Sequence, residues 1–297
     1  MSFDRFRVTV GGGCQLEVVR ALPRAPRAVA ISVPLVGGTG QQQLSIFRFL
    51  VRRGIEVASF TFRGHRGSGG TFSFPTTVTD TAAVIETVMA RALDRGLPVH
   101  LLGASYATIP LMLNLSAHPE WPVRSFVAVS GFPSIEDLLG LFDRFLSHYA
   151  RTSGQGETSG DLVQSVAADP ASLNQGFFRA MLREYLADRF PSISVSVERF
   201  EVLEYSRVNL IDELRLYSRL ISQNGEDLRT DRPSLWIYAR GDTVLELTDE
   251  RARERYCQRV LRVAPGAVFC EADVDHWARG PDRDLIADRV AGFLLRR

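Results

Sequence analysis

Three residues with complementary chemistry lie far apart in the chain: Ser105, Asp242 and His276. A serine hydroxyl is a weak nucleophile at neutral pH because its proton is held tightly. An imidazole can accept that proton, and a carboxylate can orient the imidazole and stabilise its charge. Each residue follows an apolar segment, in the order "VHLLGA", "LWIYARG" and "AVFCEADVD". The set predicts nucleophilic catalysis if the fold brings the three side chains together.

The residues next to Ser105 favour a sharp strand-to-helix turn. The stretch "GASYA" places Gly103 two residues before the serine and Ala107 two residues after it. In such a turn these two positions pass close together, so both side chains must be small. The helix that follows would offer the Tyr106 N–H beside the nucleophile. A second donor should come from the loop after "AISVP", because two donors together stabilise a tetrahedral oxyanion.

Apolar segments alternate with helical patterns over most of the chain, which predicts an α/β fold. A glycine turn, "GGGC", joins two alternating segments into a hairpin, and continuous apolar runs follow, as in strands covered on both faces. We expect strands at 6–10, 15–20, 27–36, 55–62, 97–105, 123–132, within 233–242 and at 266–273; helices at 44–54, 76–96, 106–118, 247–264 and 283–297; and a loop, "GGTGQQQ", at 37–43. Together they predict a mostly parallel sheet of about eight strands with helices on both faces.

The alternation of strands and helices breaks between residues 133 and 230, where helical patterns dominate. We therefore predict an α/β core domain of residues 1–132 and 231–297, with a helical cap inserted at 133–230. The cap contains the aromatic stretches "FDRFLSHYA" and "FFRAMLREYL". They either pack the cap onto the core or line a tunnel for an acyl group, and the sequence favours neither.

Four stretches, "GASYA", "ARGDTV", "DVDHWARG" and "FRGHRGSGG", resemble motifs of the α/β-hydrolase superfamily. Alanine stands in place of the last glycine of the family's G-x-S-x-G turn. The resemblance covers nearly the whole chain apart from the insertion. It implies that Ser105 is the nucleophile, Asp242 the orienting acid and His276 the base. It also implies a serine-dependent hydrolase or acyltransferase that acts on an ester or thioester through an acyl-enzyme on Ser105.

The same resemblance implies an oxyanion hole formed by the N–H groups of Val36 and Tyr106. Many members of the family have His-Gly just before the first donor, whereas this chain has Pro34 and Leu35 there. The first donor is therefore the N–H of Leu35 or Gly37 if the register of the loop differs.

Within the superfamily, the hairpin start, the order of loops and the helical cap resemble the acyl-transferase/thioesterase enzymes of bacterial luminescence systems. This resemblance implies a small-molecule or carrier-bound acyl substrate, with an acyl carrier protein among the candidate partners. The superfamily also hosts elimination, cyclisation and C–C cleavage with the same triad, which is the alternative function. A non-catalytic module with a relic pocket is a third interpretation, and the complete set of Ser, Asp and His argues against it.

Other polar residues offer alternative roles. Asp249 and Asp231 are lesser candidates for the orienting acid. Asp275 lies next to His276 and is expected to be a solvated loop charge. His65 lies in a glycine-rich loop near the expected cleft, where we expect a structural role. The remaining histidines show no metal-ligand spacing, so we expect neither a metal nor a cofactor.

The length and the net charge of the chain limit the classes of protein to which it can belong. The chain has 297 residues and a formal net charge of +1, so nothing indicates nucleic acid or an anionic membrane as the main partner. No apolar run approaches the ~20 residues of a membrane span, and the charged N-terminus is unlike a signal peptide. Cys14, Cys257 and Cys270 are expected to be free thiols. We therefore expect a cytoplasmic protein.

Overall fold

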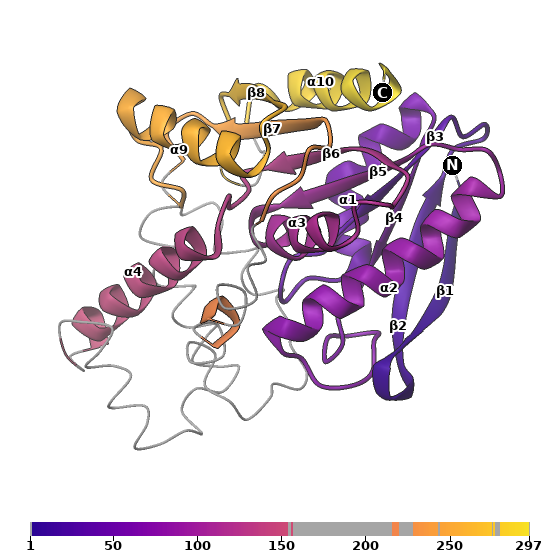
Figure 1. Ribbon diagram of the computed structural model, residues 1–297, viewed down its shortest axis with the longest axis horizontal. Helices are drawn as coiled ribbons and strands as arrows, with labels where there is room; N and C mark the ends of the chain where they lie inside the picture. Colours follow the sequence, from indigo (N-terminus) through magenta and orange to yellow (C-terminus); the bar gives the residue numbers. More distant parts are fainter. Residues whose placement is uncertain are drawn as a thin grey trace.

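One eight-stranded sheet organises the molecule, in the order β1-β2-β4-β3-β5-β6-β7-β8 (Figure 1). The computed structural model describes residues 2–153, 156, 216–219, 228–242, 244–274, 276 and 280–296. The strands are β1 Ser2–Val10, β2 Cys14–Leu22, β3 Ala28–Ser32, β4 Ile55–Phe60, β5 Val99–Ala104, β6 Val123–Val129, β7 Ser234–Ala239 and β8 Ala267–Ala272. The hairpin β1–β2 joins antiparallel to β4, and the strands from β4 to β8 are parallel. The mostly parallel sheet predicted from the sequence is confirmed.

Helices cover both faces of this sheet. They are α1 Gly40–Phe47, α2 Phe74–Leu93, α3 Thr108–Ala117, α4 Ile135–Ser153, α9 Glu250–Val263 and α10 Arg283–Arg296, with short 3-10 helices η1 Gly11–Gly13, η2 Arg48–Arg53 and η3 Ser105–Ala107. Apolar side chains of α1, η2 and α10 pack in one core cluster, and those of α2, α3 and α9 in a second. Neighbouring residues of β3 divide between the two, since Val29 belongs to one cluster and Ala30 to the other.

The segment after β3 differs from its prediction. The strand ends at Ser32 rather than continuing to residue 36, because Pro34 has no N–H for a ladder hydrogen bond. The stretch 37–43 is not all loop, because α1 already begins at Gly40. The Thr39 side chain accepts the Gln42 N–H, and Gln42 reaches back to the Thr39 N–H at 2.8 Å. The loop between β3 and α1 is therefore short, and it is fixed at its helical end.

Most of the predicted cap lies outside the described residues. Within 133–230 the structure describes residues 133–153, which include α4, then residue 156, a helical turn at 216–219 and residues 228–230. The division into core and cap stays a prediction. The strands on either side of the insertion, β6 and β7, are paired neighbours in the sheet. Chain segments before and after the insertion therefore build one core.

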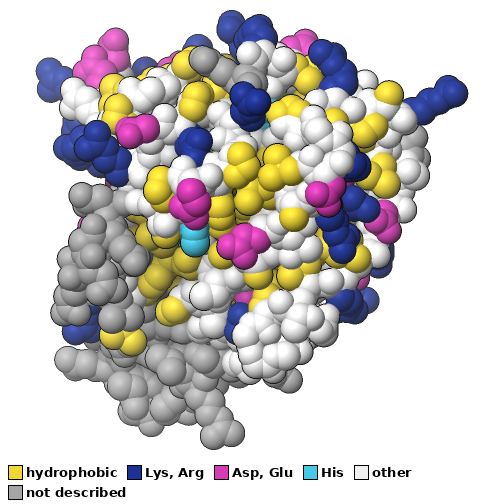
Figure 2. Space-filling model, turned by 45° about the vertical axis from the view of Figure 1, so that its right-hand side comes forward, with side chains coloured by type: hydrophobic (Ala, Val, Ile, Leu, Met, Phe, Trp, Pro, Cys, Tyr) yellow, Lys and Arg dark blue, Asp and Glu magenta, His cyan; other side chains and the backbone are white. Residues whose placement is uncertain are grey.

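The surface mixes charged and apolar groups. Figure 2 shows hydrophobic side chains gathered in a band across one face, with arginine and acidic side chains interspersed around it. Among the described residues, no helix combines the length and the apolar character that crossing a membrane requires.

Candidate active site

β5 is followed by α3 (Figure 1). Ser105 is the first residue of η3, which makes the sharp turn between these two elements. Its φ is +51°, a left-handed conformation that costs a non-glycine residue ~1–2 kcal/mol. β5 is buried along its whole length and pairs in parallel with β3 and β6, so the start of the turn is held rigidly. The strained turn places Ser105 at the carboxyl edge of the sheet, where ligands of parallel sheets bind.

Small residues make this turn sterically possible. A Cβ atom on Gly103 would lie 3.2 Å from the carbonyl carbon and oxygen of Ala107 and from Thr108 Cα. Those are backbone atoms of the turn, so a larger residue at 103 would push the turn out of place. The Thr108 hydroxyl donates to the Ser105 carbonyl at 2.7 Å and tightens the turn from the helical side. These distances account for the glycine two residues before Ser105.

His276 lies between the other two predicted residues. Its Nδ1 is 2.9 Å from Asp242 Oδ2, and its Nε2 is 2.9 Å from Ser105 Oγ. An ionised carboxylate only accepts, so Nδ1 carries the proton, and Nε2 accepts the Ser105 hydroxyl. The exposed fractions of Ser105, Asp242 and His276 are 8%, 2% and 2%. The structure thus brings the three residues into one buried, hydrogen-bonded line.

The Asp242 carboxylate is held by several further donors. Its Oδ1 accepts the N–H groups of Val244 and Leu245 at 2.9 and 3.1 Å, and the Ser130 hydroxyl also donates to the carboxylate. Burial alone would raise the pKa of Asp242. Attraction to His276 and these hydrogen bonds outweigh burial and hold the pKa below its ordinary value. Asp242 is therefore ionised at neutral pH and can stabilise a positive charge on the imidazole.

Ser130 is a site residue that sequence reasoning misses. It directly follows β6 and is 1% exposed. Its φ is +46°, and its N–H donates to the Ile237 carbonyl of β7 at 2.7 Å. This left-handed turn directs its hydroxyl at Asp242 from a neighbouring strand. A serine just after an apolar run is too common a pattern to mark such a role.

The loop after β3 opens next to Ser105, because β3 and β5 are paired neighbours. The Gly38 N–H donates to the Leu35 carbonyl at 3.0 Å, and the φ of Gly37 is +80°. A reverse turn with a positive φ only at its third residue is a type II turn, with Val36 and Gly37 at its centre. Glycine is favoured at this third position because a Cβ atom would strain the backbone.

One of the three oxyanion donors left open by the sequence is already engaged. The Gly37 N–H donates to His65 Nε2 at 2.7 Å. Among the described residues, the N–H groups of Leu35 and Val36 have no such acceptor. The structure therefore favours Leu35 or Val36 over Gly37 as a donor to a ligand.

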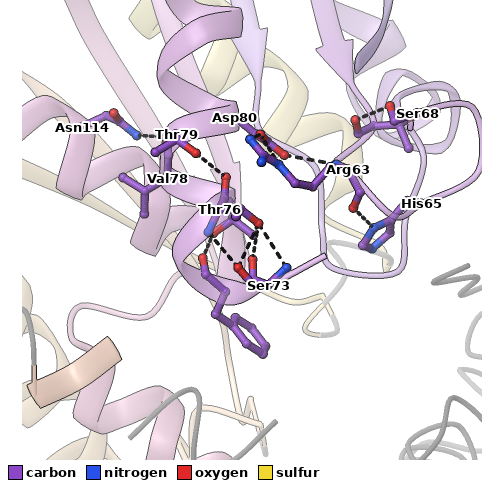
Figure 3. A network of polar contacts seen from close by, with 12 residues as sticks. Arg63, His65, Ser68, Ser73, Thr76, Val78, Thr79, Asp80 and Asn114 are labelled. Carbon is purple, nitrogen blue, oxygen red and sulfur yellow. Dashed lines mark hydrogen bonds and ion pairs between the residues drawn. The ribbon is translucent and has the colours of Figure 1, made fainter. Parts of the chain in front are cut away.

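His65 is a neutral acceptor in this arrangement. Its Nδ1 lies 3.1 Å from the Arg63 carbonyl (Figure 3). The carbonyl can only accept, so Nδ1 carries the proton and Nε2 accepts the Gly37 N–H. Burial lowers the pKa of His65 to about 4, and the hydrogen bond to Arg63 offsets only part of that effect. The ring is therefore uncharged at pH 7.

The Tyr106 side chain is turned toward α2. Its hydroxyl lies 2.7 Å from Thr77 Oγ1, and its ring packs edge-on against Phe74 with 5.3 Å between the ring centroids. Its backbone N–H belongs to the first turn after β5, at the positive end of the helical dipole. The ring thus anchors the turn while the main chain stays next to the Ser105 hydroxyl.

Comparison with known proteins identifies the family. The model of the "Alpha/beta hydrolase family" matches residues 35–289, a range that includes Ser105, Asp242 and His276. The chain belongs to the alpha/beta hydrolase family. No curated protein matches this hydrolase. The superfamily resemblance is therefore confirmed, whereas the finer resemblance to luminescence acyl-transferases stays a prediction.

Solved structures share the hydrolase fold at low sequence identity. An esterase of Pyrococcus furiosus is 15% identical with a TM-score of 0.59, covering 99% of this chain and 91% of that chain. A thermostable carboxyl esterase from Bacillus coagulans, in complex with glycerol, is 14% identical with a TM-score of 0.67, covering 99% of both chains. A lipase in an open form is 13% identical with a TM-score of 0.68, again covering 99% of both. At these identities the likeness concerns the fold.

The other candidate acids of this hydrolase lie in different surroundings. The Asp249 side chain accepts the Ala252 N–H at 2.8 Å and caps α9. Asp231 is exposed and lies 3.9 Å from the Arg229 guanidinium. Asp275 lies outside the described residues. Neither Asp249 nor Asp231 therefore takes part in the line that joins Asp242 to Ser105.

Two further histidines, His100 and His118, have ordinary hydrogen-bond partners. His100 is buried with Nδ1 2.8 Å from Ser125 Oγ, and His118 Nδ1 lies 3.1 Å from Glu120 Oε1. Across the described ranges, no group of three or more His, Cys, Asp or Glu residues could hold a metal ion.

Proposed function

We propose that this chain is a serine-dependent hydrolase that cleaves an ester or acyl thioester through an acyl-enzyme on Ser105. The observation that carries the proposal is the hydrogen-bonded line from Asp242 through His276 to Ser105, with both contacts at 2.9 Å. An activated serine requires this order of carboxylate, imidazole and hydroxyl. Membership of the alpha/beta hydrolase family supports it.

The first half of the reaction acylates Ser105. Its Oγ attacks the carbonyl carbon of the substrate while the hydroxyl proton passes to His276 Nε2. The tetrahedral intermediate collapses, the bond from carbon to the alcohol or thiol breaks, and His276 returns the proton to that leaving group. Asp242, held ionised by its donors, stabilises the imidazolium between these two transfers.

The second half releases the acyl group. A water molecule attacks the acyl carbon as its proton moves to His276, and the proton then returns to Ser105 Oγ as the acid departs. An acceptor alcohol or thiol in place of water would give acyl transfer by the same steps. In both halves, negative charge on the carbonyl oxygen would be stabilised by the N–H groups of Val36 and Tyr106.

The names of structural neighbours favour an ester substrate. They include an esterase, a carboxyl esterase and a lipase, which share this fold. A thioester on a small molecule or on an acyl carrier protein is the variant implied by the resemblance to luminescence acyl-transferases. The two substrate classes differ in the leaving group and use the same residues.

A labelling experiment tests the proposal. The folded chain would be treated with a fluorophosphonate, and mass spectrometry would locate the adduct, with Ser105→Ala as the matched control. We expect one adduct on Ser105, and hydrolysis of members of a panel of p-nitrophenyl esters and acyl thioesters by the wild type alone. No adduct on Ser105 would overturn the covalent mechanism. An adduct without turnover of any ester or thioester would favour the elimination, cyclisation or C–C cleavage alternative.

A further inference from the structure

We propose that His65 is a positioning residue of the oxyanion hole, which accepts the Gly37 N–H, anchors the turn from Leu35 to Gly38 and so holds the neighbouring Val36 N–H in place for the substrate carbonyl oxygen. The inference rests on the proposed function and extends it to a second histidine, outside the Ser105 line. Its basis is a side chain that bonds the main chain at the centre of the donor loop.

The contact between His65 and the loop is specific. Gly37 N lies 2.7 Å from His65 Nε2, and the imidazole is fully buried. Only one neutral tautomer can accept from Gly37 at Nε2 and donate to the Arg63 carbonyl at Nδ1. The Phe72 ring packs edge-on against the imidazole with 5.0 Å between centroids. The ring is therefore held at both nitrogens and on its side.

The partner of His65 is itself anchored to α2. The Arg63 guanidinium forms an ion pair with Asp80, with Nε 2.8 Å from Oδ1, and the Arg63 N–H donates to Asp80 Oδ2 at 3.1 Å (Figure 3). Asp80 is a buried residue of α2. A chain of contacts thus runs from α2 through Arg63 and His65 to Gly37. The acceptor presented to Gly37 has a fixed position in the core.

The type II turn explains why such an anchor matters. The central peptide of a β-turn can rotate, which converts type II into type I, and glycine at the third position fits both. Rotation changes ψ of Val36 and φ of Gly37, so it turns the Gly37 N–H away from His65. The Val36 N–H belongs to the preceding peptide, and its position depends on the turn as a whole being held in place. Because Gly37 N–H can meet His65 Nε2 only in one orientation, the hydrogen bond selects that orientation before substrate binds.

The first test removes the acceptor and keeps the ring. In His65→Phe, kcat for a p-nitrophenyl ester should fall about 10- to 100-fold while KM changes less than twofold. Affinity for a trifluoromethyl ketone, whose Ser105 adduct carries an oxyanion, should fall by a similar factor. His65→Gln, whose amide oxygen can accept from Gly37, should recover most of both losses. His118→Phe, a matched change at a partly exposed histidine, should behave as wild type.

The outcomes separate this role from the proposed function. If wild type forms the Ser105 adduct and His65→Phe keeps its kcat and ketone affinity, the positioning role is wrong and the function stands. Equal losses in His65→Phe and His65→Gln would also overturn it, because they indicate packing rather than an acceptor. A wild type without the Ser105 adduct would overturn both proposals.

A second variant covers the case in which His65→Phe fails to fold. Gly37→Ala leaves His65 in place and disfavours the φ of +80° that the anchored turn requires. It should lower kcat and ketone affinity together. Gly12→Ala is the matched control, since its φ is +75° and a Cβ there meets nothing within 4 Å. Unchanged kcat in Gly37→Ala would count against the proposal.

Discussion

Two buried histidines follow different strands of the sheet, and they differ in the partner of Nδ1. His276 comes after β8 and donates to the Asp242 carboxylate, whereas His65 comes after β4 and donates to the Arg63 carbonyl. A carboxylate carries a full charge that stabilises an imidazolium, whereas the Arg63 carbonyl offsets only part of the effect of burial on His65. The hydrogen-bond partner of Nδ1 therefore determines whether a buried histidine can take up a second proton at Nε2 or can only accept a hydrogen bond there.

Removing the negative charge of Asp242, the partner of His276 Nδ1, should give the largest loss of activity. In Asp242→Asn the imidazole loses the carboxylate that fixes its tautomer and stabilises its charge, so kcat should fall about 10⁴-fold. Steady-state kinetics on an ester hydrolysed by the wild type measures the loss. Asp249→Asn is the control, because asparagine caps a helix nearly as well as aspartate, and it should keep wild-type kcat. A loss below tenfold in Asp242→Asn would contradict the role of the carboxylate.

The next variant tests the Val36 N–H, the proposed oxyanion donor that His65 helps to position. Val36 is the second residue of a type II turn, where proline is well tolerated. Val36→Pro therefore deletes the proposed oxyanion donor while keeping the turn, and kcat should fall about 10²- to 10³-fold. Val36→Ala keeps the N–H and should lose little activity. If Val36→Pro keeps wild-type kcat, the first donor is Leu35 rather than Val36.

Much of the surroundings of His276 could be predicted from the sequence. Ser105, Asp242 and His276 each end an apolar segment, and parallel strands bring their carboxyl ends to one edge. The steric requirement at Gly103 follows from a local turn, so five adjacent residues are enough to show it. Buried strands also read directly as apolar runs, which made the eight-stranded sheet predictable.

The surroundings of His65 could not be predicted, because they depend on contacts between residues that are far apart in the sequence. Gly37 and His65 lie 28 positions apart, and no local pattern pairs a glycine N–H with an imidazole. Ser130 likewise acts on Asp242 from another strand. The start of α1 was missed for a different reason, because the glycines around Thr39 favour a loop while the Thr39–Gln42 capping box favours a helix.

The smallest expected effect is a loss of stability at low pH, which tests whether His65 is neutral in the native protein. Burial lowers the pKa of His65 to about 4, and burial together with the Arg124 charge does the same for His100. An unfolded histidine has a pKa of about 6.5, so between these values the unfolded chain binds a proton that the native chain does not. Stability is therefore complete above pH 6.5 and falls as the pH drops toward 4. Each of the two histidines should lower the free energy of unfolding by roughly 2 kcal/mol at pH 5.

Denaturant unfolding at pH 5.0 and 7.0 measures this loss, and paired variants assign it. His65→Gln and His100→Gln should each reduce the difference in unfolding free energy between the two pH values by about 2 kcal/mol. Asp80 and other carboxylates titrate in wild type and variants alike, so they cancel in the comparison. An unchanged pH dependence in His65→Gln would mean that the native ring is already charged at pH 5. A charged His65 cannot accept the Gly37 N–H, so that result would also weaken the positioning role.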